Sequence, residues 1–185
     1  MALRRLKLIV QYDGAPYNGW QYQPSQPSVQ QTLEEALAKL TGHPVRVYAA
    51  GRTDTGVHAA AMPVHFETAL PIPAERLPFA LAQFLPGSIS VMSAEEAPLD
   101  FDARRSAIMR WYRYQVLMTP LRQPLGPRAW HIHRRLDLQA IEDGLVHLRG
   151  EHDFSGFRSS MCQARRTVLT MEVARMRRAG DLIAF

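Results

Sequence analysis

A short polar segment, residues 51–58, places a carboxylate and a guanidinium close together in the chain. Asp54 lies two positions after Arg52, and a glycine near each end gives the backbone freedom to turn. Alternating apolar residues in the flanking ranges 45–49 and 62–66 are typical of strands. The pattern therefore predicts a turn that presents Asp54 from the end of a sheet.

The chemistry available to this turn depends on the state of Asp54. A nearby positive charge such as Arg52 favours the ionised form of a carboxylate. An ionised carboxylate can act as a nucleophile or as a general base. Alternatively, Asp54 only caps the turn by accepting hydrogen bonds from its own backbone amides, as aspartates in turns often do. The residues alone leave both interpretations open.

The segment resembles the signature Gly-Arg-Thr-Asp-Ala-Gly-Val-His of the tRNA pseudouridine synthase A (TruA) family. Other blocks that resemble this family follow in its order over essentially the whole chain: Tyr12-Asp13-Gly14, Gly19-Trp20-Gln21, Val29-Gln30, Phe101-Asp102-Ala103-Arg104, Arg110-Trp111-Tyr112-Arg113-Tyr114, Gly150-Glu151-His152-Asp153-Phe154 and Phe157. Thr55 departs from the alanine of the signature. Its hydroxyl is either tolerated or donates a hydrogen bond to Asp54 that lowers the basicity of the carboxylate.

The resemblance implies an isomerase that converts uridine to pseudouridine in the anticodon stem-loop of tRNA, at positions 38 to 40. The N1–C1′ bond breaks, the base turns, and C5 is joined to C1′. No cofactor is expected, because this reaction consumes no redox equivalent and no phosphate donor. No metal site is expected either, since the histidines lack a ligand spacing such as His-x-x-x-His. The family also implies a homodimer that binds tRNA.

Three site residues follow from the resemblance. Asp54 corresponds to the family's essential aspartate, which attacks C1′, attacks C6 or removes the 2′ proton; the sequence does not choose between these. Arg52 is expected to pair with Asp54 when the site is empty and to contact the nucleotide once it is extruded, at a cost of about a few kcal/mol. Tyr112 is expected to stack on the target base and to help remove the C5 proton.

Basic residues concentrate in the second half of the chain. Residues 101–185 hold 15 Lys and Arg against 8 Asp and Glu, whereas residues 1–100 hold 7 against 9. Arginine forks bind phosphate in a bidentate manner, so this half is predicted to contact RNA. The candidate phosphate contacts are Arg104, Arg110, Arg165 and Arg166. The alternative is a solvated basic face without a partner.

Length and composition indicate a globular protein. The 185 residues, 46% of them hydrophobic, are enough for one good core or two small ones. No apolar run approaches a membrane span, and no cleavable leader precedes the first strand. The single cysteine, Cys162, cannot form an internal disulfide. These features predict a cytoplasmic protein that does not enter a membrane.

The predicted fold class is α+β, with two ferredoxin-like halves (β-α-β-β-α-β), antiparallel sheets and a central RNA-binding cleft. The domains are expected at 1–100, with the catalytic loop, and at 101–185. The strands and helices expected in the first half cover 6–12, a helix capped by Ser28 and Gln31 and ended by Gly42, 45–49, 62–66, a helix over 75–84, and 89–92.

The second half is expected to begin with a long strand over 107–118. Alternation along it places Tyr112 and Tyr114 on one face, with Tyr114 in the core. A helix ended by Gly150 and a hairpin between 168–176 and 182–185 follow. The chain stops within that last strand, before the segment in which the family carries a Met-Val-Arg motif whose arginine contributes to the site. The sequence is therefore expected to be a fragment with an incomplete second half; the alternative is a shortened homologue that lacks this arginine and its contribution to catalysis.

Two other functions remain open. A non-catalytic RNA-binding or tRNA chaperone module of the same fold would keep the charge and the fold without turnover. A nucleoside or sugar hydrolase would use Asp54 as a nucleophile, but retaining hydrolysis needs a second carboxylate about 5–5.5 Å away. The nearest downstream acid for that role is Glu67.

Overall fold

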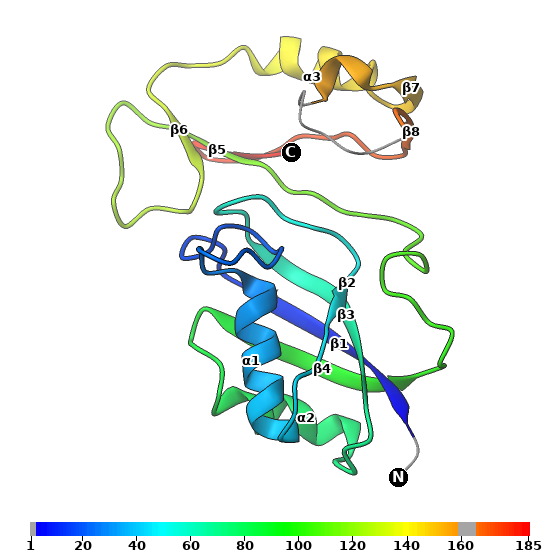
Figure 1. Ribbon diagram of the computed structural model, residues 1–185. Helices are drawn as coiled ribbons and strands as arrows, with labels where there is room; N and C mark the ends of the chain where they lie inside the picture. The colour runs from blue at the N-terminus through cyan, green and yellow to red at the C-terminus, as the bar shows by residue number, and fades with distance from the viewer. Residues whose placement is uncertain (1–2, 159–165) are drawn as a thin grey trace. The chain divides into compact units, whose positions relative to one another are not determined.

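The computed structural model describes residues 3–158 and 166–185. The chain is a mixed α+β protein with mainly antiparallel sheets and few helices, and it forms two compact units, Met1–Met109 and Arg110–Phe185 (Figure 1). No sheet is shared between the two units, which are described separately below.

The first unit contains one four-stranded sheet and two α-helices. Its elements are β1 (Arg4–Tyr12), α1 (Val29–Thr41), β2 (Tyr48–Ala49), β3 (Ala59–Thr68), the 3-10 turn η1 (Ala74–Arg76), α2 (Leu77–Ala82) and β4 (Ile89–Ala97). The strand order is β2-β3-β1-β4, and every neighbouring pair is antiparallel. The β-α-β-β-α-β order of elements is the one expected from the sequence.

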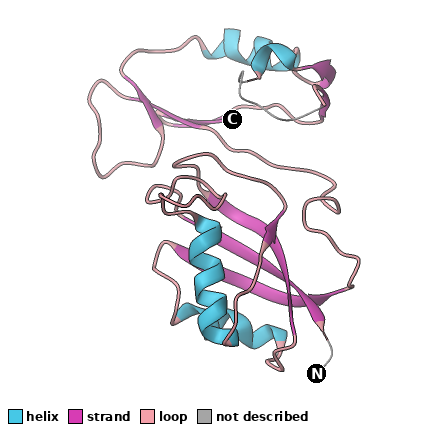
Figure 2. Cartoon of the chain, viewed as in Figure 1, coloured by secondary structure: helices cyan, strands magenta, loops and turns pink. Residues whose placement is uncertain are grey.

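The core of this unit forms between the helices and one face of the sheet. Alternate residues of β1, Leu6, Leu8 and Val10, are fully buried because successive side chains of a strand point to opposite faces. They belong to one cluster with Leu33 and Leu37 of α1, which lies across the strands in Figure 2. Burial of each such side chain contributes about 1.5–3 kcal/mol, so the sheet end beside the loop is rigidly supported.

Helix α1 begins and ends as the sequence predicts. The Ser28 hydroxyl accepts a hydrogen bond from the Gln31 backbone N–H at 3.2 Å, and Gly42 closes the helix at a φ of 79°. The reciprocal bond of a capping box, in which the Gln31 side-chain oxygen would accept from the Ser28 backbone N–H, is not formed; the Gln31 side chain turns toward Glu35, to which its Nε2 donates at 2.9 Å. Only half of the predicted capping box is present.

The strand expected over 45–49 is wrong except for its last two residues. Val47 is buried, but its backbone is paired to helix α1 and not to a strand. Its N–H donates to Glu34 Oε1 at 3.1 Å, and its carbonyl accepts from Gln30 Nε2 at 3.4 Å. Because these polar side chains satisfy the backbone, apolar alternation alone could not distinguish this segment from a strand.

The turn that follows β4 packs against the sheet face that carries His65. The Ala103 N–H donates to the buried His65 Nδ1 at 3.1 Å, and the carbonyl of Phe101 accepts from Arg5 at 2.6 Å. Asp102 Oδ1 accepts the N–H groups that follow it in the turn. Those bonds, chiefly that from Arg105, lower the pKa of Asp102. Residues 101–105 therefore lie with the first unit.

His65 makes this packing sensitive to acid. Burial and the nearby Arg5 lower its pKa, while Asp102 and Glu67 oppose the shift less strongly. Below about pH 6.5 the unfolded chain then binds more protons at this residue than the folded chain, so stability falls as the pH falls through this window. We expect a greater loss of thermal stability between about pH 7.5 and about pH 5.5 for the parent than for His65→Gln. Equal losses in calorimetry would contradict this role.

The second unit contains a four-stranded sheet, a two-stranded sheet and one α-helix. Its elements are β5 (Gln115–Met118), β6 (Trp130–Ile132), α3 (Leu138–Val146), β7 (Gly150–Asp153), the 3-10 turn η2 (Ser155–Phe157), β8 (Val168–Met171), β9 (Arg177–Ala179) and β10 (Leu182–Ala184). The larger sheet has the order β6-β5-β10-β9, in which only the pair β5–β6 is parallel.

Several expectations for this unit are corrected by the structure. The strand expected over 107–118 is formed only over Gln115–Met118, and pairing begins at Tyr114, which exchanges backbone bonds of 2.8 and 3.0 Å with Phe185. The alternation used to place Tyr112 on a strand face therefore does not apply. Tyr114 is 57% exposed and not in the core; its ring contacts that of Trp130 edge-on.

The helix and the hairpin of this unit also end differently from the prediction. α3 ends at Val146, and Gly150 begins β7. The turn at Gly180 is present with a φ of 61°, but the strand before it is β9, while the expected partner β8 pairs with β7. Across residues 3–158 and 166–185, no helix has the length and apolar character needed to cross a membrane.

Candidate active site

The loop 51–58 connects β2 to β3, and the segment between β1 and α1 holds its backbone. The Trp20 N–H donates to the Thr53 carbonyl at 3.0 Å, and the Gly56 N–H donates to the Tyr17 carbonyl at 3.3 Å. Within the loop, the Val57 N–H donates to the Asp54 carbonyl at 3.1 Å. The backbone is thus fixed on both sides of Asp54.

Side chains add further contacts to this support. The Tyr12 hydroxyl lies 2.8 Å from the Thr53 hydroxyl, and burial raises the pKa of Tyr12, so the phenol stays neutral. At the other end of the loop, His58 Nδ1 lies 2.9 Å from Asp13 Oδ1 and 3.1 Å from the Gly14 nitrogen. Both ends of the loop are therefore tied to the residues around the end of β1.

Two glycines allow the supporting segment to approach the loop closely. A Cβ on Gly14 would lie 2.0 Å from the Val57 carbonyl oxygen, and one on Gly19 would lie 2.6 Å from that of Thr53. Side chains at either position would require the backbone to move. These close approaches give a reason for the glycines of the Tyr-Asp-Gly and Gly-Trp-Gln blocks, which sequence reasoning did not assign a role. The only sequence signal for that role was the presence of a glycine close to an aromatic residue in each block.

Asp54 itself is exposed, and the fold does not use its carboxylate. Across residues 3–158 and 166–185, its side chain forms no ion pair and accepts no hydrogen bond. Other turn aspartates behave differently, since Asp102 and Asp153 each accept backbone N–H groups. The interpretation that Asp54 only caps its turn is therefore wrong. A carboxylate that the turn does not need is available for chemistry on a bound molecule.

Arg52 lies in the same loop with an exposed side chain. The expected pairing of Arg52 with Asp54 is not observed, since in the described part of the chain no guanidinium–carboxylate contact joins them. The guanidinium is instead exposed to solvent, two positions before Asp54 in the sequence. It is placed to meet an anionic or planar group that enters from outside.

The remaining predicted residues belong to other segments of the chain. Tyr112 belongs to the second unit and is 82% exposed. Arg104 and Arg110 are exposed, and Arg166 is exposed with its Nε donating to the Val168 carbonyl at 2.8 Å. Arg165 lies outside the described residues, as does Cys162. That Tyr112 and Asp54 contribute to the same site stays a prediction.

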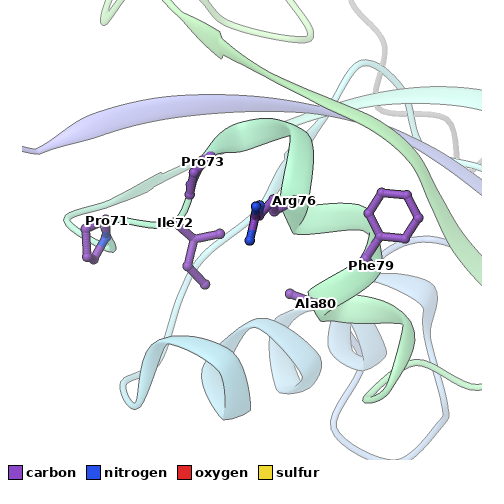
Figure 3. A pocket seen from close by; sticks show the side chains of 6 residues that line it. All are labelled: Pro71, Ile72, Pro73, Arg76, Phe79 and Ala80. Atoms are coloured by element: carbon purple, nitrogen blue, oxygen red, sulfur yellow. The ribbon is translucent and has the colours of Figure 1, made fainter.

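A surface hollow formed by residues of η1, of α2 and of the segment before them does not resemble this site. Figure 3 shows the side chains that line it: Pro71, Ile72, Pro73, Arg76, Phe79 and Ala80. The lining is mainly apolar and contains no carboxylate, so it offers neither a nucleophile nor a base. In the described residues, no group of three or more His, Cys, Asp or Glu side chains is arranged to hold a metal ion.

Comparison with known proteins decides the family. The profile of the tRNA pseudouridine synthase family matches residues 8–104, a range that contains the loop and the segment supporting it. This chain belongs to the tRNA pseudouridine synthase family. Among curated members, tRNA pseudouridine synthase A of Syntrophotalea carbinolica is 49% identical over 164 residues. The enzymes of that name from Pelobacter propionicus and Herminiimonas arsenicoxydans are 41% and 45% identical.

These synthases are longer than this chain. The match covers 88% of this chain and 65% of the Syntrophotalea synthase, and 98% of this chain and 75% of the Pelobacter synthase. For the Herminiimonas synthase the figures are 98% and 68%. The similarity to the Pelobacter and Herminiimonas synthases therefore extends through both units.

A side chain at Gly14 should displace the loop backbone at Val57 without changing any of the proposed catalytic residues. We expect Gly14→Ala to destabilise the protein by about 1–3 kcal/mol, because the new Cβ collides with backbone that cannot rotate away. Gly87→Ala is the matched control, since a Cβ there meets nothing within 4 Å. Urea unfolding of both variants measures the difference. A Gly14→Ala protein as stable as Gly87→Ala would contradict the close contact.

Proposed function

We propose that this protein is a tRNA pseudouridine synthase that isomerises uridine in the anticodon stem-loop, at positions 38 to 40. The proposal depends chiefly on one observation: the Asp54 carboxylate is exposed and unused by the fold on a loop whose backbone is fixed on both sides. The family relationship and the names of the related synthases supply the reaction and the substrate class.

The reaction needs one carboxylate near the ribose. As the N1–C1′ bond stretches, positive character develops on the sugar, and a carboxylate stabilises it much as in glycoside hydrolysis. Asp54 supplies this group, whether it bonds to C1′, bonds to C6 or accepts the 2′ proton. After the base has turned, C5 bonds to C1′, the C5 proton leaves to solvent, and N1 gains a proton. The atoms balance without an added reactant.

Arg52 and Tyr112 hold the extruded nucleotide in this proposal. The guanidinium of Arg52 is open to solvent and suits a phosphate or the edge of a base. The exposed ring of Tyr112 offers a stacking surface, which contributes about 1–3 kcal/mol per base. Its hydroxyl is proposed to assist removal of the C5 proton. Arg104, Arg110, Arg165 and Arg166 are proposed phosphate contacts.

The proposal includes two ferredoxin-like halves around an RNA-binding cleft. The strand order β2-β3-β1-β4 of the first unit, with a helix between β1 and β2, supports it. In the second unit, β5, β10 and β9 lie in the same relative order as β1, β3 and β2, and α3 again follows the first strand of the set. The expectations of a homodimer and of a cytoplasmic location stay part of this proposal.

The contacts of Glu67 do not favour the hydrolase alternative. Glu67, the acid considered for that role, is exposed on β3 and forms an ion pair and hydrogen bond with Arg5. Its carboxylate is thus engaged within the sheet. A hydrolase would also release free uracil, which isomerisation does not.

Nucleoside mapping tests the proposed function. We expect the purified full-length protein to convert uridine to pseudouridine at positions 38 to 40 of unmodified tRNA, with no uracil released. Digestion of the tRNA and mass spectrometry after chemical marking of pseudouridine give both the amount and the position. Conversion at other positions alone would refute the anticodon assignment. Binding without conversion would favour an RNA-binding module, and release of uracil would favour a hydrolase.

A further inference from the structure

The residue after Asp54 forms a side-chain bond that the sequence did not indicate. The Thr55 hydroxyl donates to Asn18 Oδ1 at 2.6 Å. A hydroxyl has one proton, so in this arrangement Thr55 cannot also donate to Asp54. Of the two outcomes expected for Thr55, the bond to Asp54 is not the one formed, because the hydroxyl donates to Asn18.

Asn18 is itself held in the orientation that this bond requires. Its Nδ2 donates to Gln23 Oε1 at 3.2 Å, and Gln23 Nε2 donates to the Asn18 carbonyl at 3.3 Å. Its backbone N–H donates to the Pro27 carbonyl at 2.8 Å. With the amide nitrogen engaged by Gln23, the amide oxygen faces Thr55. The acceptor is therefore in place before the loop meets any ligand.

The position of this bond in the loop gives it a distinct role. The contacts of Trp20 and Tyr12 fix the loop at Thr53, before Asp54, and that of Tyr17 fixes it at Gly56. The bond from Thr55 acts between these points, on the residue that directly follows the carboxylate. It restrains Thr55 and, through the shared peptide, the backbone that carries the Asp54 side chain.

We propose that Asn18 and Thr55 form a positioning pair that orients the Asp54 carboxylate and withholds the Thr55 proton from it. The inference depends on the proposed function, because it concerns the efficiency of that same reaction. The pair touches no substrate and acts only through Asp54. Alanine at position 55, as in the signature that the segment resembles, cannot form this bond. The pair is thus a specific feature of chains with a hydroxyl at this position.

A double-mutant cycle on the full-length protein tests the pair. Thr55→Ala and Asn18→Ala are each expected to lower kcat for pseudouridine formation about three- to tenfold, with KM changed less than about twofold. The double variant should lose no more than either single variant, because both remove the same bond. Thr55→Ser keeps the hydroxyl and should retain most of the parental kcat.

Thr41→Ala is the matched control, because the Thr41 hydroxyl also forms a hydrogen bond within the first unit but at the end of α1, where it lies 2.8 Å from the His43 carbonyl and 2.9 Å from that of Leu37. It should leave kcat unchanged. Losses that multiply in the double variant, or a Thr55→Ala variant with the parental kcat, would overturn the positioning pair while the parent remains active. A parent that forms no pseudouridine would refute the proposed function, and this inference with it.

Discussion

Asp54→Asn is expected to abolish pseudouridine formation while the fold and tRNA binding persist. The side chain is exposed and accepts no hydrogen bond within the described residues, so the substitution should change stability by less than about 0.5 kcal/mol. The amide can neither bond to the sugar or base nor take up a proton, so kcat should fall at least about a thousandfold. Single-turnover conversion of tRNA by excess protein measures this loss.

Asp100→Asn provides a matched control for this experiment. Asp100 is an exposed acid of the first unit, in the turn after β4, and it carries no predicted role. The Asp100→Asn variant should convert uridine in tRNA at the parental rate. An Asp54→Asn protein that retains a tenth or more of the parental rate would show that another group performs the chemistry, and the candidate active site would be wrong.

Arg52→Ala is expected to have the second largest effect. Hydrogen bonds from a charged group contribute about 1.5–3 kcal/mol, so kcat/KM should fall about ten- to hundredfold. Arg52→Lys should recover only part of this loss, because an ammonium cannot reproduce the planar, two-pronged contact of a guanidinium. Steady-state kinetics with unmodified tRNA measure kcat/KM for the parent, Arg52→Ala and Arg52→Lys.

The control for Arg52 is another exposed arginine of the same unit. Arg46 pairs with Glu34 at 3.4 Å, and surface pairs of this kind contribute little. Arg46→Ala should therefore change kcat/KM less than about twofold. If Arg46→Ala and Arg52→Ala lose activity equally, the effect of Arg52 comes from general charge and not from its place beside Asp54.

The predictable parts of this structure are those fixed by local chemistry. Ser28 and Gly42 bound α1 because a hydroxyl and a glycine satisfy the ends of any helix in this way. The loop with Arg52 and Asp54 was expected between strands, and β2 and β3 flank it. Polar residues between two strands were sufficient for that prediction.

The parts that sequence reasoning missed depend on contacts between distant segments. Val47 follows an apolar alternation, yet side chains of α1 satisfy its backbone. Tyr112 was placed on a long strand, but β5 begins only at Gln115, and its neighbour Tyr114 exchanges backbone bonds with Phe185, far away in the sequence. The bond from Thr55 to Asn18 joins residues 37 positions apart, and no local pattern predicts such a contact.

Release of tritium from tRNA that carries C5-tritiated uridine tests the central claim most directly. Joining C5 to C1′ requires the C5 hydrogen to leave, whereas binding and hydrolysis leave it on the base. We expect the full-length protein to release one tritium for each pseudouridine formed, and Asp54→Asn to release none above background. Equal release by the parent and by Asp54→Asn, or no release by an intact parent that binds tRNA, would contradict the account.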